Sequence, residues 1–300
     1  MDEKALIDKY SKHVPGMSVL FQVENWLHFV TKDGLEMHTY LYPATEAKCV
    51  VISLHGLGSY SQPTGLIAKT LADAGCEVVA FDFRGHGKSQ GIRGFINSVD
   101  DLVQDTLDFL LEIEKLYKDL PIFIMGGSIG GAVTINVSIL AHNRLAGIIL
   151  INPAIGINSR FEGCIRGISN CLASCCPTMP VYKGDLWSTS KNETLHKYWD
   201  ENPYFYNGKV RIGTSAAVMN CMKSLRSKYH LVQNKLLLIQ GTDDKVTSVK
   251  KVNSFMKKVE VQDKTLLMYP GRPHSIIFED AVFEIAAKIR DWVVEKLLLI

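Results

Sequence analysis

Short runs of consecutive apolar residues recur along the chain, separated by longer segments with helical periodicity. The runs are rich in valine, isoleucine and leucine, and they occupy residues 50–54, 78–81, 122–125, 148–151, 236–239 and 266–268. Continuous hydrophobicity is typical of strands in a parallel sheet whose two faces are both covered by helices. We therefore expect these runs to form the central sheet of an α/β protein.

The segment after Ser98 illustrates the helical pattern. Ser98 and Asp101 resemble a capping box, in which a hydroxyl and a carboxylate three residues apart start a helix. Behind them, leucine and isoleucine recur mostly every three or four positions and form one apolar stripe. Alternation of such helices with buried strands predicts a doubly wound sheet with right-handed crossovers. Upstream, apolar stretches on either side of Asp33-Gly34 predict a leading antiparallel hairpin from residues 28–30 and 37–41.

Between residues 151 and 236 this alternation stops. No strand is predicted there, and the composition shifts towards cysteine, serine, asparagine and aromatic residues. Because the span exceeds an ordinary crossover, we expect a mainly helical subdomain, residues 154–232, inserted into a core of residues 1–153 and 233–300. Apolar residues at helical spacing form a stripe within it: Phe161, Cys164, Ile165, Ile168, Cys171, Leu172 and Cys175. The stripe either packs over the core or contacts a bilayer surface.

The composition of the 300 residues is that of a globular chain, 47% hydrophobic and 21% charged. Thirty-three Lys and Arg residues oppose 31 Asp and Glu residues, which leaves a net charge of +2. Such a balance, without a long block of like charge, argues against a nucleic acid partner. The pairs Lys250-Lys251 and Lys257-Lys258 are typical of the solvated face of a helix.

Seven cysteines without a repeated spacing predict free thiols in a reducing compartment rather than a disulfide framework. The first residues carry mixed charge with no apolar run behind them, unlike a secretory signal. No stretch reaches the roughly 18 apolar residues that a membrane span needs. We expect a cytoplasmic protein that at most touches membranes at their surface.

A candidate nucleophile lies where the run 122–125 gives way to a helical pattern. Gly126-Gly127-Ser128-Ile129-Gly130 matches G-x-S-x-G, the nucleophile elbow, in its strand-to-helix context. The turn is so sharp that side chains beside the serine would collide, and glycine on both sides removes the clash. The N-terminus of the following helix offers N–H groups and a partial positive charge to a developing oxyanion.

A serine hydroxyl needs a base, and the base needs an acid to orient it. His274 follows the last apolar run, and Asp243 and Asp244 follow the run 236–239. All three positions lie just beyond strands, where open α/β sheets bind their ligands. The chain order of Ser128, an aspartate and His274 is that of α/β hydrolases. From position alone, either aspartate can orient the imidazole while the other caps the helix expected near Val246.

His55-Gly56-Leu57-Gly58 ends the first buried run, at the position of the second oxyanion donor in this fold. The predicted donors are therefore the backbone N–H groups of Leu57 and Ile129. His55 is expected to hold the turn by hydrogen bonding rather than to act as a second base.

These motifs, taken together, resemble those of monoacylglycerol lipases and their lysophospholipase-like relatives. The segment 81–91 is similar to the family's D-x-R-G-H-G-x-S-x-G, and further matches cover about residues 25–295, only sparsely within the insertion. They include 55–58, 126–130, Asn202-Pro203, 241–244, 263–266 and 271–274. The resemblance implies an α/β-hydrolase fold, with a mostly parallel sheet flanked by helices and a mobile cap over an apolar acyl tunnel. It also favours Asp244, because Gly241-x-x-Asp244 fits the family's acid loop.

Two positions depart from the family pattern. Many relatives have a histidine where this chain has Gly127, and the mammalian lipase has a glutamate at the position of Ser59. The first departure leaves the chemistry intact, whereas the second bears on the recognition of glycerol.

Two other motifs carry no function. Gly87-Lys88-Ser89 resembles the end of a phosphate-binding P-loop, but Asp82 stands where that motif requires glycine. The cysteines at 171, 175 and 176 lack partners at zinc spacing, so no metal and no cofactor are expected.

We therefore predict a serine hydrolase with Ser128, Asp244 and His274 as its triad. The resemblance implies that it hydrolyses monoacylglycerols or similar single-chain lipid esters to a fatty acid and an alcohol. Trp199, Tyr204 and Tyr206 are candidates for shaping the alcohol pocket. The alternatives are a broader carboxylesterase or lysophospholipase with the same triad, and a non-catalytic lipid-binding protein on this fold.

Overall fold

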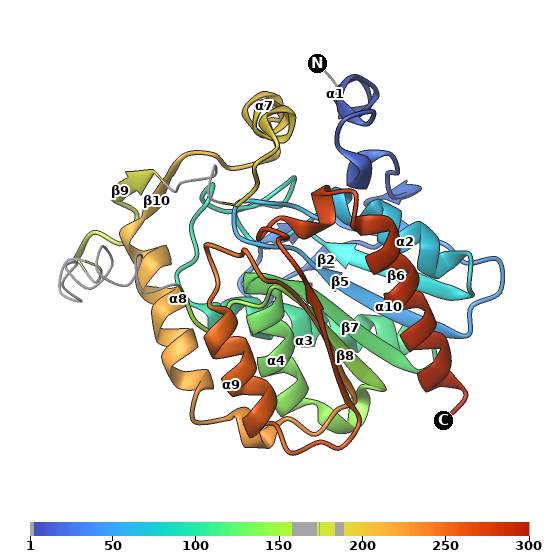
Figure 1. Ribbon diagram of the computed structural model, residues 1–300. Helices are drawn as coiled ribbons and strands as arrows, with labels where there is room; N and C mark the ends of the chain where they lie inside the picture. Colours follow the sequence, from blue (N-terminus) through green and yellow to red (C-terminus); the bar gives the residue numbers. More distant parts are fainter. Residues whose placement is uncertain (1–2, 158–172, 174, 184–188, 300) are drawn as a thin grey trace.

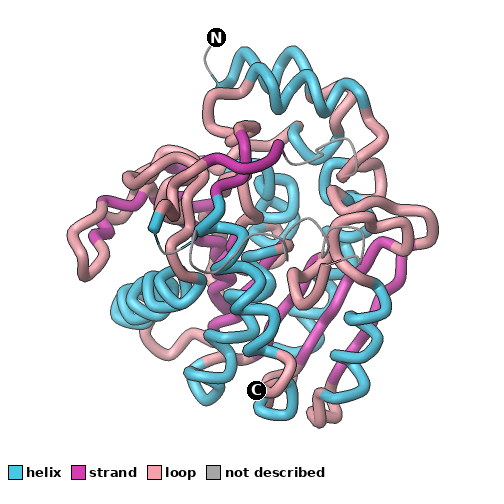
Figure 2. The backbone as a smooth tube through the Cα atoms, turned by 90° about the vertical axis from the view of Figure 1, so that its left-hand side faces the viewer, coloured by secondary structure: helices cyan, strands magenta, loops and turns pink. Residues whose placement is uncertain are grey.

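The computed structural model describes residues 3–157, 173, 175–183 and 189–299 (Figure 1). The α-helices are α1 Glu3–Tyr10, α2 Gly65–Ala72, α3 Val99–Leu116, α4 Ile129–Leu140, α7 Glu193–Glu201, α8 Ile212–Leu225, α9 Val249–Lys258 and α10 Val282–Leu297. Short 3-10 helices are η1 Pro15–Met17, η2 Gln62–Thr64, η3 His142–Arg144, η5 Tyr229–Leu231 and η6 Ile276–Phe278. In both backbone views the strands of the main sheet lie inside the molecule, with helices around them (Figure 1, Figure 2).

The centre of the molecule is an eight-stranded sheet in the order β1-β4-β6-β5-β7-β8-β11-β12. Its strands are β1 Val23–Glu24, β4 Thr39–Tyr42, β5 Cys49–Leu54, β6 Cys76–Phe81, β7 Ile122–Gly127, β8 Gly147–Ile151, β11 Leu236–Gly241 and β12 Lys264–Tyr269. The neighbours from β6 to β12 pair in parallel, whereas β4 is antiparallel to both β6 and β1. The six apolar runs all lie in parallel strands, so the predicted α/β fold class is confirmed.

Alternate residues of each central strand face two separate apolar layers. In β5, Val50 and Ile52 join a buried cluster with side chains of α3, α4 and α9, whereas Val51 joins one formed with α2 and α10. Helices α3 and α4 therefore cover one face and α2 and α10 the other, as Figure 1 shows. Ser98 caps α3 by accepting a hydrogen bond from the Asp100 N–H, which confirms the predicted helix start.

The predicted hairpin is correct only in part. Strands β2 (Phe29–Val30) and β3 (Glu36–Met37) pair antiparallel across the Asp33-Gly34 turn. However, the second predicted arm, 37–41, is divided, because residues from Thr39 onward leave the hairpin and pair with β6 in the main sheet.

The inserted region also departs from the expectation that it contains no strand. Within it, β9 (Pro180–Lys183) and β10 (Lys209–Arg211) form a separate antiparallel pair, with a register shift between Val210 and Arg211. The residues of both strands are half-buried or exposed. Their sequences therefore lack the apolar run by which a buried strand is recognised. The apolar stripe predicted from Phe161 to Cys175 lies outside the described residues, apart from the exposed Cys175.

The N-terminal helix α1 lies beside α7 at the top of the molecule, far from the C-terminus (Figure 1). Tyr10 packs edge-on against Tyr198 with ring centroids 5.8 Å apart, and Lys9 forms an ion pair with Glu201. Residues 192 positions apart in the chain are thereby joined, and the N-terminal segment contacts the inserted region directly.

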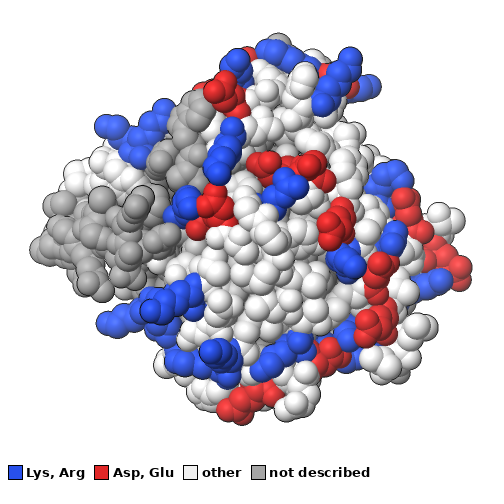
Figure 3. All heavy atoms as spheres, in the orientation of Figure 1, with Lys and Arg blue, Asp and Glu red and all other residues white. Residues whose placement is uncertain are grey.

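The surface carries acidic and basic side chains interspersed, mostly around an uncharged central area of the face that Figure 3 shows. This distribution matches the small net charge of +2. Within the described part of the chain, every helix is too short or too polar to cross a bilayer.

Candidate active site

Ser128 occupies a strained turn between β7 and α4. Its φ of +52° and ψ of −116° lie outside the regions that side chains ordinarily favour. The flanking glycines are sterically required, because a Cβ on Gly126 would lie 2.3 Å from the Gly130 carbonyl oxygen. A Cβ on Gly130 would lie 2.5 Å from the carbonyl oxygen of Leu54. Gly127 is different: a Cβ there meets nothing closer than 3.9 Å, so glycine is not sterically required at this position.

The structure brings Ser128, His274 and Asp244 together from three separate loops. His274 Nε2 lies 3.1 Å from Ser128 Oγ, and His274 Nδ1 lies 2.8 Å from Asp244 Oδ2. Since an ionised carboxylate only accepts hydrogen bonds, the imidazole carries its proton on Nδ1 and leaves Nε2 free to accept from the hydroxyl. This chain of hydrogen bonds can draw the proton from the serine.

Asp244 is buried and accepts hydrogen bonds on both carboxylate oxygens. Oδ1 accepts from the backbone N–H groups of Val246 and Thr247, and Oδ2 accepts from the Thr247 hydroxyl and Gln240 Nε2 as well as from His274. Burial by itself raises the pKa of Asp244, but its electrostatic interaction and hydrogen bond with the imidazole of His274, together with the hydrogen bonds from Thr247, outweigh burial, so the pKa lies below its usual value. The carboxylate is therefore ionised at neutral pH.

Asp243 points elsewhere and takes no part in this chain. It pairs with Lys191 and Lys245 at the surface, and hydrogen bonds from these two lysines lower its pKa to about 2. We expected one aspartate to cap the following helix and the other to orient the imidazole. This expectation is wrong, because Asp244 alone accepts from the loop N–H groups and contacts His274. The helix expected near Val246 begins only at Val249.

The predicted oxyanion donors, Leu57 and Ile129, both belong to segments that adjoin Ser128. Ile129 is the first residue of α4, so its N–H belongs to the first turn, whose N–H groups have no intrahelical acceptor. Leu57 lies in the loop after β5, which approaches the serine so closely that a Cβ on Gly56 would be 3.3 Å from the Ser128 Cβ. Both residues line the α8 side of the site together with Ser128, where an oxyanion donor is needed.

His55 holds the loop after β5, as predicted. Its Nε2 accepts a hydrogen bond from the Phe83 N–H, so the proton lies on Nδ1 and is donated to the Gly56 carbonyl. Burial lowers the pKa of His55 to about 4. The ring is therefore neutral at pH 7 and fully engaged.

Sequence reasoning missed Asn152, which joins the loops of the candidate triad. Its side chain donates to the carbonyls of Pro273 and His274 and accepts from the Gly241 N–H. Asn152 has a φ of +44°, a conformation that asparagine tolerates better than most residues. The sequence offers one signal for Asn152: like the other site residues, it lies just beyond an apolar run, here residues 148–151.

Two chambers meet at Ser128 and His274. The first, which we call the histidine-loop chamber, has a volume of about 150 Å³ and is lined by Leu54, Pro63, Trp199, Phe205, Ile277 and Phe278. The second, the α8 chamber, has a volume of about 240 Å³ and is lined by Ile157, Tyr182, Val210, Val218, Met219 and Met222. Both are lined mainly by apolar side chains, so a substrate can extend away from the serine in two directions along apolar walls.

Of the three aromatic residues suggested for the alcohol pocket, two line a chamber. Trp199 lines the histidine-loop chamber, and Tyr206 lines both chambers. Tyr204 instead packs against the Tyr60 ring, 5.6 Å between centroids, under Lys88. Phe205, which was not predicted, takes its place in the wall.

Among the described residues, no group of three or more His, Cys, Asp or Glu side chains is arranged to hold a metal ion. The polar groups that meet at the chambers are instead the serine, the imidazole and backbone N–H groups, which are suited to acyl transfer.

Comparison with known proteins places the chain among the α/β hydrolases. Residues 45–281 match the family described as serine aminopeptidase, S33. Monoglyceride lipase from Mus musculus is 26% identical over 89% of both chains. Caffeoylshikimate esterase from Arabidopsis thaliana is 29% identical over 90% of this chain and 85% of its own. The crystal structure of Paleococcus ferrophilus monoacylglycerol lipase, 24% identical, shares the fold with a TM-score of 0.77 over 87% of this chain and 99% of its own. The chain therefore belongs to the serine aminopeptidase S33 family and is a carboxylic ester hydrolase similar to the monoglyceride lipases.

Proposed function

We propose that the protein hydrolyses esters of single-chain lipids, such as monoacylglycerols, through a Ser128–His274–Asp244 triad. The observation that carries the proposal is the unbroken hydrogen-bond chain from the Ser128 hydroxyl through His274 to the buried Asp244 carboxylate. A protein that only binds lipids has no need of such a chain, nor of a strained serine between two sterically required glycines.

In the first half of the reaction, His274 Nε2 takes the hydroxyl proton as Ser128 Oγ attacks the ester carbonyl carbon. Asp244 stabilises the resulting imidazolium. The oxyanion accepts hydrogen bonds from the Leu57 and Ile129 N–H groups, each of which contributes about 3 kcal/mol to lowering the barrier. His274 then protonates the departing alcohol oxygen. An acyl-enzyme remains, and water, activated by the same imidazole, releases the fatty acid.

We infer from the linings of the two chambers which part of the ester each one receives. The leaving oxygen must lie next to His274, which lines both chambers, and the residues that follow it, Ser275, Ile277 and Phe278, line only the histidine-loop chamber. We place the alcohol there and the acyl chain in the α8 chamber, which is larger and apolar. Monoglyceride lipases among the relatives support a single-chain lipid as substrate.

The proposal includes a cap formed by residues 154–232. The α8 chamber is walled by side chains of α8, β9 and β10, all of which belong to this inserted segment. A cap that covers the serine excludes water from the acyl-enzyme. Contact between the apolar stripe of this segment and a bilayer stays a prediction.

Covalent labelling tests the proposal directly. A fluorophosphonate probe is expected to label the protein at Ser128, and Ser128→Ala is expected to abolish both labelling and ester turnover, with kcat lowered by about 10⁶-fold. Ser138→Ala, which removes another buried hydroxyl of α4, is the matched control and should still be labelled. Wild-type turnover by Ser128→Ala would refute the proposal.

A broader carboxylesterase or a lysophospholipase would use the same residues. Rates on monoacylglycerols, lysophospholipids and short p-nitrophenyl esters with a common acyl chain separate these activities.

A further inference from the structure

Helix α1 supports one wall of the histidine-loop chamber from behind. Three apolar side chains of α1 share a buried cluster with Trp199 and Phe278: Leu6, Ile7 and Tyr10. Trp199 and Phe278 line the chamber, whereas no residue of α1 is among the described residues that do so. The helix therefore lies outside the chamber and can influence a substrate only through the residues that it contacts.

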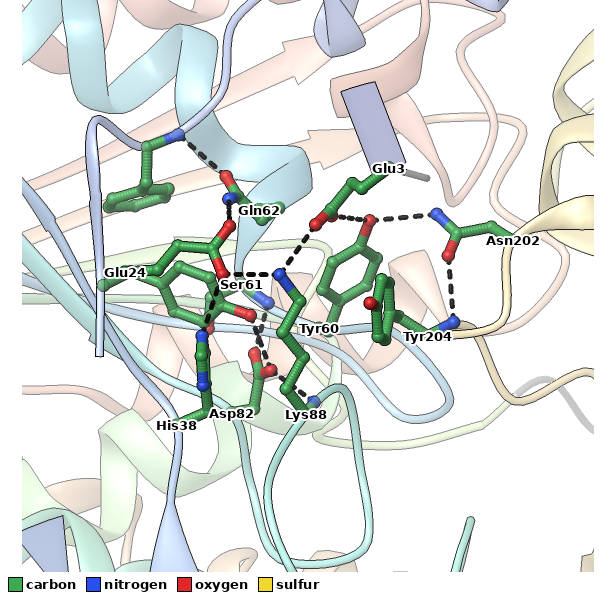
Figure 4. A network of polar contacts seen from close by, with 12 residues as sticks. Glu3, Glu24, His38, Tyr60, Ser61, Gln62, Asp82, Lys88, Asn202 and Tyr204 are labelled. Atoms are coloured by element: carbon green, nitrogen blue, oxygen red, sulfur yellow. Dashed lines mark hydrogen bonds and ion pairs between the residues drawn. The ribbon is translucent and has the colours of Figure 1, made fainter. Parts of the chain in front are cut away.

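Tyr60 connects α1 to the chamber. Its side chain is fully buried, it lines the chamber, and its ring centroid lies 5.3 Å from that of Phe205, another lining residue. The Tyr60 hydroxyl donates a hydrogen bond of 2.5 Å to the Glu3 carboxylate and accepts one of 2.9 Å from Asn202 Nδ2, as Figure 4 shows. A single oxygen atom thus joins α1, the loop after β5 and the segment that follows α7.

The segment 202–207 is tied to the loop after β5 at two points. The Tyr206 N–H donates to the Gly58 carbonyl, with the nitrogen and oxygen 2.8 Å apart. The second point is the hydrogen bond from Asn202 to the Tyr60 hydroxyl. Three consecutive residues of this segment line the chamber. The position of this part of the wall therefore depends on the Tyr60 hydroxyl.

Glu3 determines the orientation of that hydroxyl. Because a hydroxyl has one proton, its donation to Glu3 leaves the Tyr60 oxygen to accept from Asn202. The Glu3 side chain is only 9% exposed, and Lys88 Nζ holds its carboxylate in place from 2.8 Å away. A hydrogen bond to a carboxylate is roughly twice as strong as one between neutral groups. Loss of this acceptor would leave a buried proton without its partner and release the bond to Asn202.

Glu24 provides a comparison within the same charged cluster, which consists of Glu3, Glu24 and Lys88 (Figure 4). Lys88 Nζ lies 2.5 Å from Glu24, whose other partners are His38 and Gln62. None of these partners is among the described residues that line the chamber. The two carboxylates thus share one cation, but only Glu3 forms a hydrogen bond with a residue of the wall.

We propose that Glu3 is a positioning residue of the active site, which acts through the Tyr60 hydroxyl to fix Tyr60 and the segment 202–207 as a wall of the histidine-loop chamber. Helix α1 thereby determines how closely this wall fits the alcohol part of the ester. The inference rests on the proposed function and deepens it, because it names a residue outside the chamber that controls selection of the alcohol.

The change Glu3→Ala tests the inference when two octanoyl esters are compared. 1-Octanoylglycerol places its glycerol in the chamber, whereas methyl octanoate leaves the chamber nearly empty. The ratio of kcat/KM for the glycerol ester to kcat/KM for the methyl ester should fall about fivefold, because a displaced wall loses contacts with the alcohol. Since the acyl chain is constant, this ratio reports the alcohol side alone.

Glu24→Ala is the matched control, because it removes the other carboxylate beside Lys88. Both variants should lose thermal stability, but in Glu24→Ala the ratio should stay within about twofold of the wild-type value. An unchanged ratio in Glu3→Ala, or an equal fall in Glu24→Ala, would overturn the inference.

Tyr60→Phe tests the path between Glu3 and the wall. It keeps the ring and removes only the hydroxyl, so the same ratio should fall by a similar factor. In the double variant Glu3→Ala/Tyr60→Phe the ratio should fall no further, because both changes remove one hydrogen bond. No fall in Tyr60→Phe, or a fall in the double variant equal to the product of the two single falls, would contradict the assigned path. If Glu3→Ala does not fold, Tyr60→Phe alone decides between these outcomes.

Fluorophosphonate labelling of Ser128 separates the two possible failures. A protein that is labelled and hydrolyses methyl octanoate, but whose variants keep the wild-type ratio, refutes only this inference. A protein that is not labelled refutes the proposed function and this inference with it.

Discussion

The carboxyl edge of the sheet and the wall of the histidine-loop chamber are built by different forces. At the edge, Asp244 accepts hydrogen bonds on both oxygens, and Asn152 bonds to the histidine and acid loops. In the wall, Trp199, Phe205 and Phe278 meet through ring contacts. Directional bonds fix atoms to within a fraction of an ångström, whereas apolar packing sets shape and volume. Substitutions at the carboxyl edge of the sheet should therefore lower kcat, and substitutions in the chamber wall should change substrate selectivity and the stability of the protein.

The largest effect is expected where the two adjacent aspartates are compared. Asp244→Asn should lower kcat by about 10⁴-fold, because an amide no longer holds the imidazole in its reactive tautomer. Asp243→Asn should change kcat less than about threefold, because it removes only surface ion pairs. Steady-state kinetics on one ester measure both. A similar loss of kcat in both variants would show that Asp244 has no special role in orienting the imidazole.

A smaller effect is expected from Asn152→Ala, which releases the histidine and acid loops from β8. We expect kcat to fall by about 10- to 100-fold, since small displacements of reacting groups are costly. Asn234→Ala is the matched control, because Asn234 also bonds two carbonyls, those of His142 and Leu145, at the other edge of the sheet. Both variants should lose thermal stability. An equal loss of kcat would mean that Asn152 acts on stability alone.

The smallest effect is expected in the charged cluster behind the chamber wall (Figure 4). The hydrogen bond from His38, together with that from Lys88, outweighs burial and lowers the pKa of Glu24 to about 2. A depressed folded-state pKa stabilises the protein above the unfolded-state value and loses that contribution as the pH falls towards the folded value. Because Glu24 is partly exposed, its discounted contribution is about 1 kcal/mol at pH 7.

Glu24→Gln should therefore lower the free energy of unfolding at pH 7, and the difference from wild type should shrink between pH 4.5 and pH 2. Urea unfolding at several pH values measures it. Glu46→Gln, at an exposed position, is the control and should show little difference at any pH. A difference that grows in acid would contradict the sign of the assigned pKa shift.

Much of the fold and part of the site could be predicted from local pattern. Apolar runs identify buried strands whatever their partners, and the steric demands of the elbow require glycine at 126 and 130. Since parallel strands end at one edge, residues following three separate runs were expected to meet. His274 does lie within hydrogen-bond distance of Ser128 on one side and of Asp244 on the other.

Other features depended on packing between distant segments. The patterns around residues 180 and 209 do not reveal that these segments pair, because neither strand is buried. Position alone does not separate Asp243 from Asp244, since both follow β11 and only the path of the loop decides which carboxylate turns inward.

The parallel core strands, the strained turn at Ser128 and the edge of the sheet at which its partners lie were thus determined by the sequence itself, because steric and hydrophobic rules act on neighbouring residues. The commitment of Tyr60 to Glu3 and the bridging role of Asn152 were decided only by the tertiary structure. A hydrogen bond between residues far apart in the chain exists only when packing brings both partners to within about 3 Å, and no local pattern encodes that distance.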